Sequence, residues 1–245
     1  SFFMLFFTYA LHKEFFGNKY SLASPLILST TLLWINYSHL ATQDIIYSSL
    51  ITLGIYSSVK FLKGSKNTFL ILSAIWIGFA FMMKTSLTFI PFLAILPLFL
   101  HGKFFYKKLF WVGLIIGFIP FLLWSFKVVS VYGFFTYSDL FRKLFYLSSK
   151  NPFTNPFYYY LWNLPLNIFP WSFLALIGFI SSLKIKKLTE RYILFFYPLI
   201  IIMILSFFST KTPYYPIQIL SLLSLNTFTA MSNIIWNKTL LNKII

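Results

Sequence analysis

The sequence predicts an all-α membrane protein, a polytopic bundle of about nine transmembrane helices. Of its 245 residues, 59% are hydrophobic and only 10% are charged, with a mean hydropathy of +0.80. Apolar runs that approach or cross a bilayer in length recur along the whole chain, and short lysine-rich connectors separate them. Backbone groups in lipid must be paired internally, so such runs are helical. We expect a single transmembrane domain over residues 1–245.

The apolar runs define the expected helices in order. They cover roughly residues 1–11, 22–38, 45–62, 68–83, 86–100, 109–126, 166–183, 192–208 and 214–235. The run at 68–83 is only about 24 Å long as a helix, against a hydrocarbon core of about 30 Å. Lys84, which follows it, is therefore expected to lie below the headgroups.

The chain begins inside an apolar run, with Ser1 and no basic leader. We expect it to be an N-terminally truncated fragment of a longer protein.

The basic residues indicate the orientation. The formal charge is +16, and alternating topology gathers 14 of the 20 Lys and Arg residues on one face. The positive-inside rule places that face in the cytoplasm. Asp44, Lys84, Lys211 and a loop over residues 127–165 then lie outside. Short basic clusters at helix ends fit anionic lipid headgroups as partners and exclude a nucleic-acid groove.

The predicted outer loop is rich in aromatic residues. Within it, apolar side chains at 137, 140, 141, 144 and 145 share one helical face, with polar side chains opposite. This pattern predicts a helix lying on the membrane surface.

Three outer connectors carry the candidate site residues. They are residues 38–44 with His39 and Asp44, residues 83–86 with Lys84, and residues 209–216 with Lys211 and Tyr214. One carboxylate with two ammonium groups suits a phosphate ester of a lipid. Each also has a structural explanation: Asp44 as a helix cap, Lys211 as an interfacial anchor, Lys84 as a snorkelling lysine and His39 as an interfacial hydrogen bonder.

Metal chemistry receives little support from the sequence. The three histidines fall in separate connectors, cysteine is absent and no acidic pair occurs. We assign no metal ligand and no cofactor, although a divalent cation in the full-length protein stays open.

Five short motifs follow one another along the chain: His39–Asp44, Gly78–Lys84, Tyr158–Tyr160, Pro170–Trp171 and Phe208–Tyr214. In content and in order they resemble the lipid-phosphate-sugar-dependent glycosyltransferases of the glycosyltransferase C superfamily, namely the protein O-mannosyltransferase and lipid A aminoarabinose transferase type. The chain departs from the family pattern at three positions: His39 stands where arginine is common, Thr85 where glycine is usual, and Pro216 comes early.

The resemblance implies an inverting transfer of a sugar from a polyprenyl-phosphate donor to a lipid, glycan or protein acceptor in the cell envelope. It places Lys84 and Lys211 at the donor phosphate, with Tyr214 and His39 at the substrate and Asp44 in a supporting role. It also places the main catalytic acid upstream of Ser1, so that the fragment alone is expected to be inactive.

Two other functions stay open on the sequence. A polysaccharide polymerase or ligase also combines many spans with a large outer loop, but it is expected to have several outer arginines, and Arg142 is the only arginine assigned to the outer face. A non-enzymatic transporter of lipid-linked glycans is expected to have inverted repeats and polar groups near mid-membrane. The expected location is the plasma (inner) membrane of a bacterium.

Overall fold

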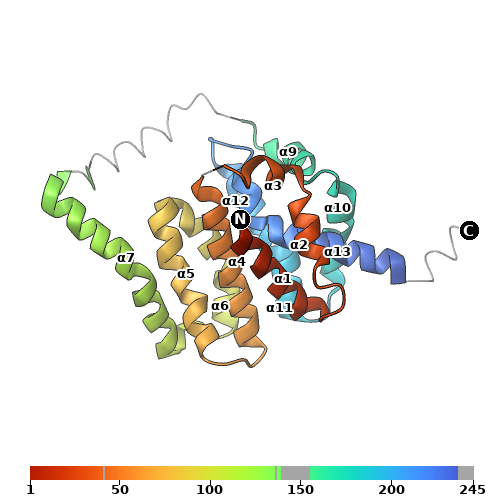
Figure 1. The fold of residues 1–245 in the computed structure, drawn as a ribbon, viewed down its shortest axis with the longest axis horizontal. Coiled ribbons are helices and arrows are strands. Elements are labelled where there is room, and N and C mark those ends of the chain that lie inside the picture. Colours follow the sequence, from red (N-terminus) through yellow and green to blue (C-terminus); the bar gives the residue numbers. More distant parts are fainter. Residues whose placement is uncertain (41, 136, 139–154, 237–245) are drawn as a thin grey trace, which may run out of the picture.

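The computed structural model describes residues 1–245 except 41, 136, 139–154 and 237–245. Every regular element of this described part is a helix, as the sequence predicts, and the helices form one bundle (Figure 1). Buried aliphatic and aromatic side chains from most of the helices make up one continuous core.

The first three helices build one side of the bundle. α1 (Phe2–Phe16) leads away from Ser1, and α2 (Ala23–Ser29) and α3 (Leu32–Tyr37) lead back. The Ser1 hydroxyl donates to the Ser38 carbonyl at 3.1 Å, so the return ends where α1 began. The single helix predicted over 22–38 is wrong. It breaks because Thr31 caps a new helix, its hydroxyl accepting from the Trp34 amide.

The next four helices cross the bundle in alternating directions. They are α4 (Gln43–Leu62), α5 (Thr68–Lys84), α6 (Phe89–His101) and α7 (Lys108–Tyr132), with short 3₁₀ turns η1 (Thr85–Thr88) and η2 (Phe104–Tyr106). An added Cβ on Gly113 would lie 2.4 Å from the Ile71 carbonyl oxygen, and one on Gly117 2.4 Å from that of Ile75. α5 and α7 therefore run parallel in close contact. α6, which links them along the chain, runs in the opposite direction and packs against α12 and α4 (Figure 1).

A sharp bend separates α9 (Tyr159–Ile168) from α10 (Ser172–Ser181) and its 3₁₀ extension η3 (Ser182–Lys184). The angle between the two parts is 114°. Pro170, after a cis peptide bond, has no amide proton to continue α9, and the preceding Phe169 carbonyl accepts from the Leu32 amide at 3.0 Å. The straight helix predicted over 166–183 is therefore wrong.

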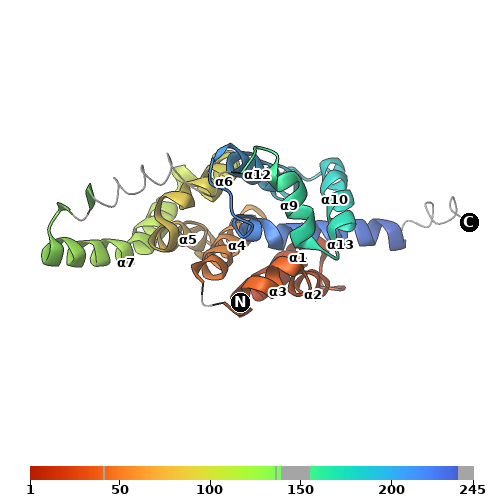
Figure 2. The ribbon, with the colours of Figure 1, turned by 90° about the horizontal axis from the view of Figure 1, so that it is seen from above.

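The last helices bring polar groups into the middle of the bundle. α11 (Leu188–Arg191), a π-helical turn η4 (Tyr192–Phe196) and α12 (Tyr197–Phe207) form one continuous run, followed by η5 (Tyr215–Ile219) and α13 (Leu220–Trp236). Ser221 on α13 is hydrogen-bonded to Thr8 and Thr52, and the Asn226 side-chain Nδ2 donates to the Leu194 carbonyl. Figure 2 shows α13 running through the bundle beneath α9, α10 and α12.

The two ends of the bundle differ in charge. At one end, here called the glutamate end, Lys60 pairs with Glu14, and Lys63 and Lys187 both pair with Glu190. At the other, the Asp44 end, α4 begins and α5 finishes. Three of the lysines that the sequence assigns to the crowded basic face, Lys60, Lys63 and Lys187, thus lie at the glutamate end.

Four described helical stretches are long and apolar enough to cross a membrane, or up to five if the bent pair counts as one. They are Gln43–Leu62, Thr68–His101, Lys108–Tyr132 and Leu188–Phe207. Of these, Thr68–His101 contains the reversal between α5 and α6. The protein is a multi-pass membrane protein, and the number nine stays a prediction.

The predicted outer loop is shorter than residues 127–165, because α7 continues to Tyr132 and α9 already begins at Tyr159. The surface helix predicted around residues 137–146 falls largely outside the described residues.

Candidate functional site

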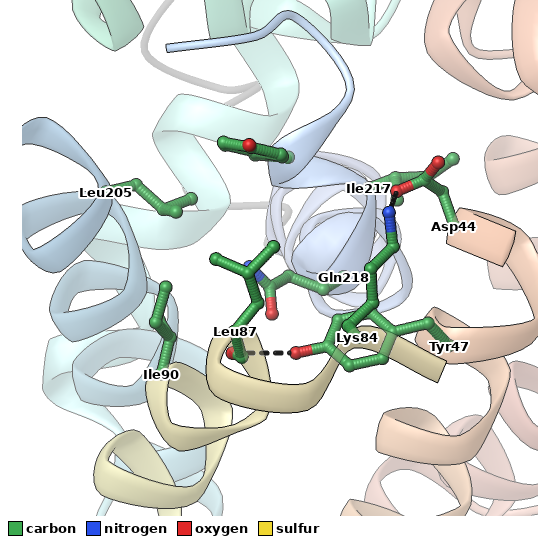
Figure 3. A pocket seen from close by; sticks show the side chains of 9 residues that line it. Asp44, Tyr47, Lys84, Leu87, Ile90, Leu205, Ile217 and Gln218 are labelled. Atoms are coloured by element: carbon green, nitrogen blue, oxygen red, sulfur yellow. Dashed lines mark hydrogen bonds and ion pairs between the residues drawn. The ribbon is translucent and has the colours of Figure 1, made fainter. Parts of the chain in front are cut away.

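An ion pair at the Asp44 end joins two helices. Asp44 lies in the first turn of α4 and Lys84 in the last turn of α5, where the helix dipoles favour a carboxylate and an ammonium respectively. The Lys84 Nζ lies 2.9 Å from the Asp44 Oδ1 (Figure 3). The two side chains are 18% and 13% exposed, so the pair is partly shielded from solvent.

Tyrosines cover this ion pair. The Lys84 ammonium lies 5.8 Å from the ring centroid of Tyr214, within range of a cation–π contact. The Tyr214 ring packs against Tyr37 at 5.6 Å and Tyr215 at 5.3 Å. The charged group is thus held between a carboxylate and an aromatic face.

A cavity of about 20 Å³, enough for roughly one water molecule, lies beside the pair. It is lined by Asp44, Tyr47, Lys84, Leu87, Ile90, Leu205, Tyr215, Ile217 and Gln218 (Figure 3). The Tyr47 hydroxyl donates to the Leu87 carbonyl at 3.0 Å. Gln218 is 5% exposed, and its carboxamide oxygen is buried without a hydrogen-bond partner among the described residues.

The backbone after Lys84 is strained. Thr85 has a φ of 42°, in the left-handed region that a β-branched residue rarely adopts. This residue ends α5 and turns the chain into η1, so it fixes the position from which Lys84 projects. Glycine, which is usual at this position in the family that the motifs resemble, would adopt this φ without the steric cost of a side chain.

Lys211 has a different set of partners. Its Nζ donates to the backbone carbonyl oxygens of Asn155 at 2.9 Å and Phe208 at 2.6 Å, and the Asn155 side-chain Nδ2 donates back to the Lys211 carbonyl at 3.2 Å. The residue is only 4% exposed, and burial lowers the pKa of its ammonium. Lys211 therefore ties the segment that carries Tyr214 to the chain before α9.

His39 lies at the same end but outside this group. Its Nδ1 is within 2.9 Å of the Ile35 carbonyl, one turn earlier, and the bond is exposed. The structure thus brings Lys84 into contact with both Asp44 and Tyr214. The Lys211 ammonium instead binds backbone carbonyls, and His39 lies apart from both lysines. Among the described residues, no three His, Cys, Asp or Glu side chains come together as a metal site.

Sequence reasoning missed Tyr37, Tyr215 and Gln218. Tyr215 is typical of an interfacial aromatic belt, Tyr37 stands at the end of an apolar run, and Gln218 is a single amide in an apolar run. No local pattern distinguishes them, since only the packing of α3, α4 and η5 brings them to the ion pair.

Comparison with known proteins now adds to this geometry. The family model described as dolichyl-phosphate-mannose-protein mannosyltransferase matches residues 1–125, half of the chain, including Asp44 and Lys84. The chain belongs to this family. Membership in the dolichyl-phosphate-mannose-protein mannosyltransferase family confirms the resemblance inferred from the five motifs. No curated protein matches the chain.

Two solved structures share the fold of this family member. The crystal structure of ArnT from Cupriavidus metallidurans bound to undecaprenyl phosphate superimposes with a TM-score of 0.81 at 14% identity, covering 99% of this chain and 47% of that one. The same protein in its apo state gives a TM-score of 0.75 at 14% identity, covering 98% and 46%. The fold is that of the glycosyltransferase C superfamily, and the chain spans about half the length of these matches.

Proposed function

We propose that the protein is a membrane glycosyltransferase that moves a sugar from a polyprenyl-phosphate donor to a lipid, glycan or protein acceptor. Family membership and the fold shared with a protein crystallised with undecaprenyl phosphate support this proposal. The observation that carries it is the Lys84 ammonium, held at the end of α5 between Asp44 and Tyr214.

Lys84 suits the donor phosphate for electrostatic reasons. It is partly shielded from solvent, so its attraction for an anion exceeds that of a fully hydrated lysine. The carboxyl-terminal end of a helix by itself repels anions, so here the side chain provides the attraction. The aromatic cover gives the site an amphipathic wall of the kind found at membrane interfaces.

The reaction is a displacement at the anomeric carbon. The acceptor oxygen forms the new bond to that carbon from the opposite side, and the bond to the donor phosphate breaks. Both electrons of the broken bond stay on the phosphate oxygen, where Lys84 stabilises the developing charge. The acceptor proton passes to a carboxylate base. We do not assign this role to Asp44, because it is paired with Lys84.

The remaining candidates receive supporting roles. We propose that Lys211 holds the 208–214 segment in place and so positions Tyr214 over the donor headgroup. The buried amide oxygen of Gln218 suits a water molecule in the adjoining cavity, which has room for about one. The positive-inside rule favours a protein in a bacterial plasma membrane with its Asp44 end outward.

The test is transfer from a radiolabelled polyprenyl-phosphate sugar by the full-length protein in membranes. Lys84→Met removes the ammonium and keeps the bulk of the side chain. Loss of one charged hydrogen bond to the phosphate is worth about 1.5–3 kcal/mol, so we expect kcat/KM to fall by about tenfold to a hundredfold.

Two controls make the result specific. Lys66→Met removes an exposed lysine between α4 and α5, at the opposite end, and is expected to leave transfer unchanged. Asp44→Asn/Lys84→Met leaves no buried carboxylate unpaired, so a loss that persists in this double variant does not arise from misfolding. Undiminished transfer by Lys84→Met would overturn the assignment of the phosphate site.

A further inference from the structure

We propose that Asp44 sets how the protein distinguishes its donor from its released product. Its carboxylate competes with phosphate for the Lys84 ammonium and so weakens the hold on the more highly charged product. This inference rests on the proposed function and assigns Asp44 a specific part in it.

The chemistry of the transfer supplies the difference to be recognised. In the donor, the phosphate is a diester that carries one negative charge. After transfer, the phosphate oxygen keeps the electron pair of the broken bond, and the freed polyprenyl phosphate is a monoester. Near pH 7 such a monoester carries a charge of about −1.5 to −2. A site that merely attracts anions would therefore bind the product more tightly than the donor.

The geometry places a compensating anion at the decisive atom. The Asp44 Oδ1 lies 2.9 Å from the Lys84 Nζ, and both side chains are largely shielded. The Tyr214 ring that contacts the Lys84 ammonium is uncharged, so only Asp44 compensates the positive charge of Lys84 among the described contacts. Glu14 and Glu190, the other acidic residues that the structure describes, pair with lysines at the glutamate end. Asp44 is thus the one acidic side chain that the described residues place beside Lys84.

Two consequences follow for a bound phosphate. A phosphate on Lys84 lies next to the Asp44 carboxylate, and the repulsion increases with the charge of the phosphate. When the product leaves, the ammonium regains its carboxylate partner and is not left uncompensated. Asp44 therefore favours release of the dianionic product more than release of the monoanionic donor.

A purely structural role makes the opposite prediction. Through its ion pair, Asp44 also links the start of α4 to the end of α5. If this structural link were its whole role, removing its charge should weaken the binding of both ligands. Asparagine keeps the size of the side chain and a hydrogen-bonding oxygen at the first turn of the helix, but it removes the charge. Asp44→Asn therefore separates the charge of this residue from its structural contact.

The experiment measures binding of two ligands to the full-length protein in nanodiscs of neutral lipid. One ligand is polyprenyl phosphate, and the other is its methyl diester, which has the same tail and a single charge. Each displaces radiolabelled polyprenyl phosphate from the wild type, from Asp44→Asn and from the charge-conserving Asp44→Glu.

We expect Asp44→Asn to bind the monoester about tenfold more tightly than the wild type and the diester only about threefold more tightly. Asp44→Glu should keep the monoester-to-diester ratio of the wild type. In turnover with added polyprenyl phosphate, product inhibition should set in at lower concentrations for Asp44→Asn.

Weaker binding of both ligands by Asp44→Asn would overturn the inference and favour a purely structural role for Asp44. An equal gain for both ligands would overturn it as well, because charge discrimination would then be absent. If the wild type binds neither ligand, the proposed function itself fails. Failure of the inference is therefore distinguishable from failure of the function.

Discussion

Lys211 provides the sharpest test of how the structure assigns the two lysines at the Asp44 end. The perturbation is Lys211→Met, which keeps the apolar stem and removes the ammonium. In the structure this ammonium donates to the carbonyls of Asn155 and Phe208 and fixes the segment that leads to Tyr214. We therefore expect the variant to lose stability.

The size of the loss follows from two opposing contributions. Two hydrogen bonds from a charged donor contribute about 1.5–3 kcal/mol each, or about 3–6 kcal/mol together. Lys211 is only 4% exposed, so methionine avoids the cost of burying a charge at this position. This gain offsets part of the stability that is lost with the two hydrogen bonds. A net loss of about 2 kcal/mol corresponds to a decrease in Tm of about 4–8 °C for a unit of 245 residues, and to a smaller decrease in a longer full-length protein that unfolds as one unit.

The pKa of Lys211 adds a second observable. Burial lowers this pKa in the folded protein below the ordinary value of 10.5. Between the two values the unfolded chain binds more protons than the folded one, so this group makes the wild type more stable as the pH rises. The stability difference between wild type and Lys211→Met should therefore increase with pH as the pH approaches 10.5.

The assay is thermal unfolding of the full-length protein in detergent, over a pH series, with donor binding measured alongside. Lys127→Met, an exposed lysine near the end of α7, is the matched control and should change stability by less than about 0.5 kcal/mol. An unchanged Tm together with a loss of donor binding would refute the reasoning, because it would make Lys211 a phosphate ligand and not a structural tie.

Two further predictions concern packing and the aromatic cover. Gly178→Ala should lower stability by about 2–3 kcal/mol in the same unfolding assay, because its Cβ would lie 1.7 Å from the Asn226 carbonyl oxygen and force α10 away from α13. An unaltered Tm would show that these helices are not in close contact. Tyr214→Leu should weaken donor binding about threefold to fivefold through loss of the cation–π contact with Lys84, whereas Tyr214→Phe keeps the ring and should bind normally. Equal losses in the two variants would assign the effect to the hydroxyl group.

The site was predictable where charge is rare. Asp44 and Lys84 stand out as charged residues at the ends of apolar runs, and the structure pairs them at 2.9 Å. Tyr214 was found through its motif and now lies over Lys84. The partners of Lys211 were not predictable, because they are the backbone carbonyls of Asn155 and Phe208. Every residue has a backbone carbonyl, so no pattern of side chains marks these two.

The breaks in the helices show the same limit. Residues 22–38 and 166–183 are apolar enough for one helix each, yet Thr31 and Pro170 divide them. The two interruptions touch each other, since the Leu32 amide donates to the Phe169 carbonyl and the Trp171 indole donates to the Thr30 hydroxyl. Hydropathy cannot register such a contact, because it counts side chains and not backbone partners.

The sequence by itself determined the all-helical membrane class, because lipid leaves backbone groups only internal partners and the apolar runs are too frequent for another solution. Only the tertiary structure decided that Lys84 faces Asp44 and Tyr214 while Lys211 binds backbone carbonyls. Both lysines end apolar runs with the same charge, and their roles separate only when packing gives each ammonium its neighbours.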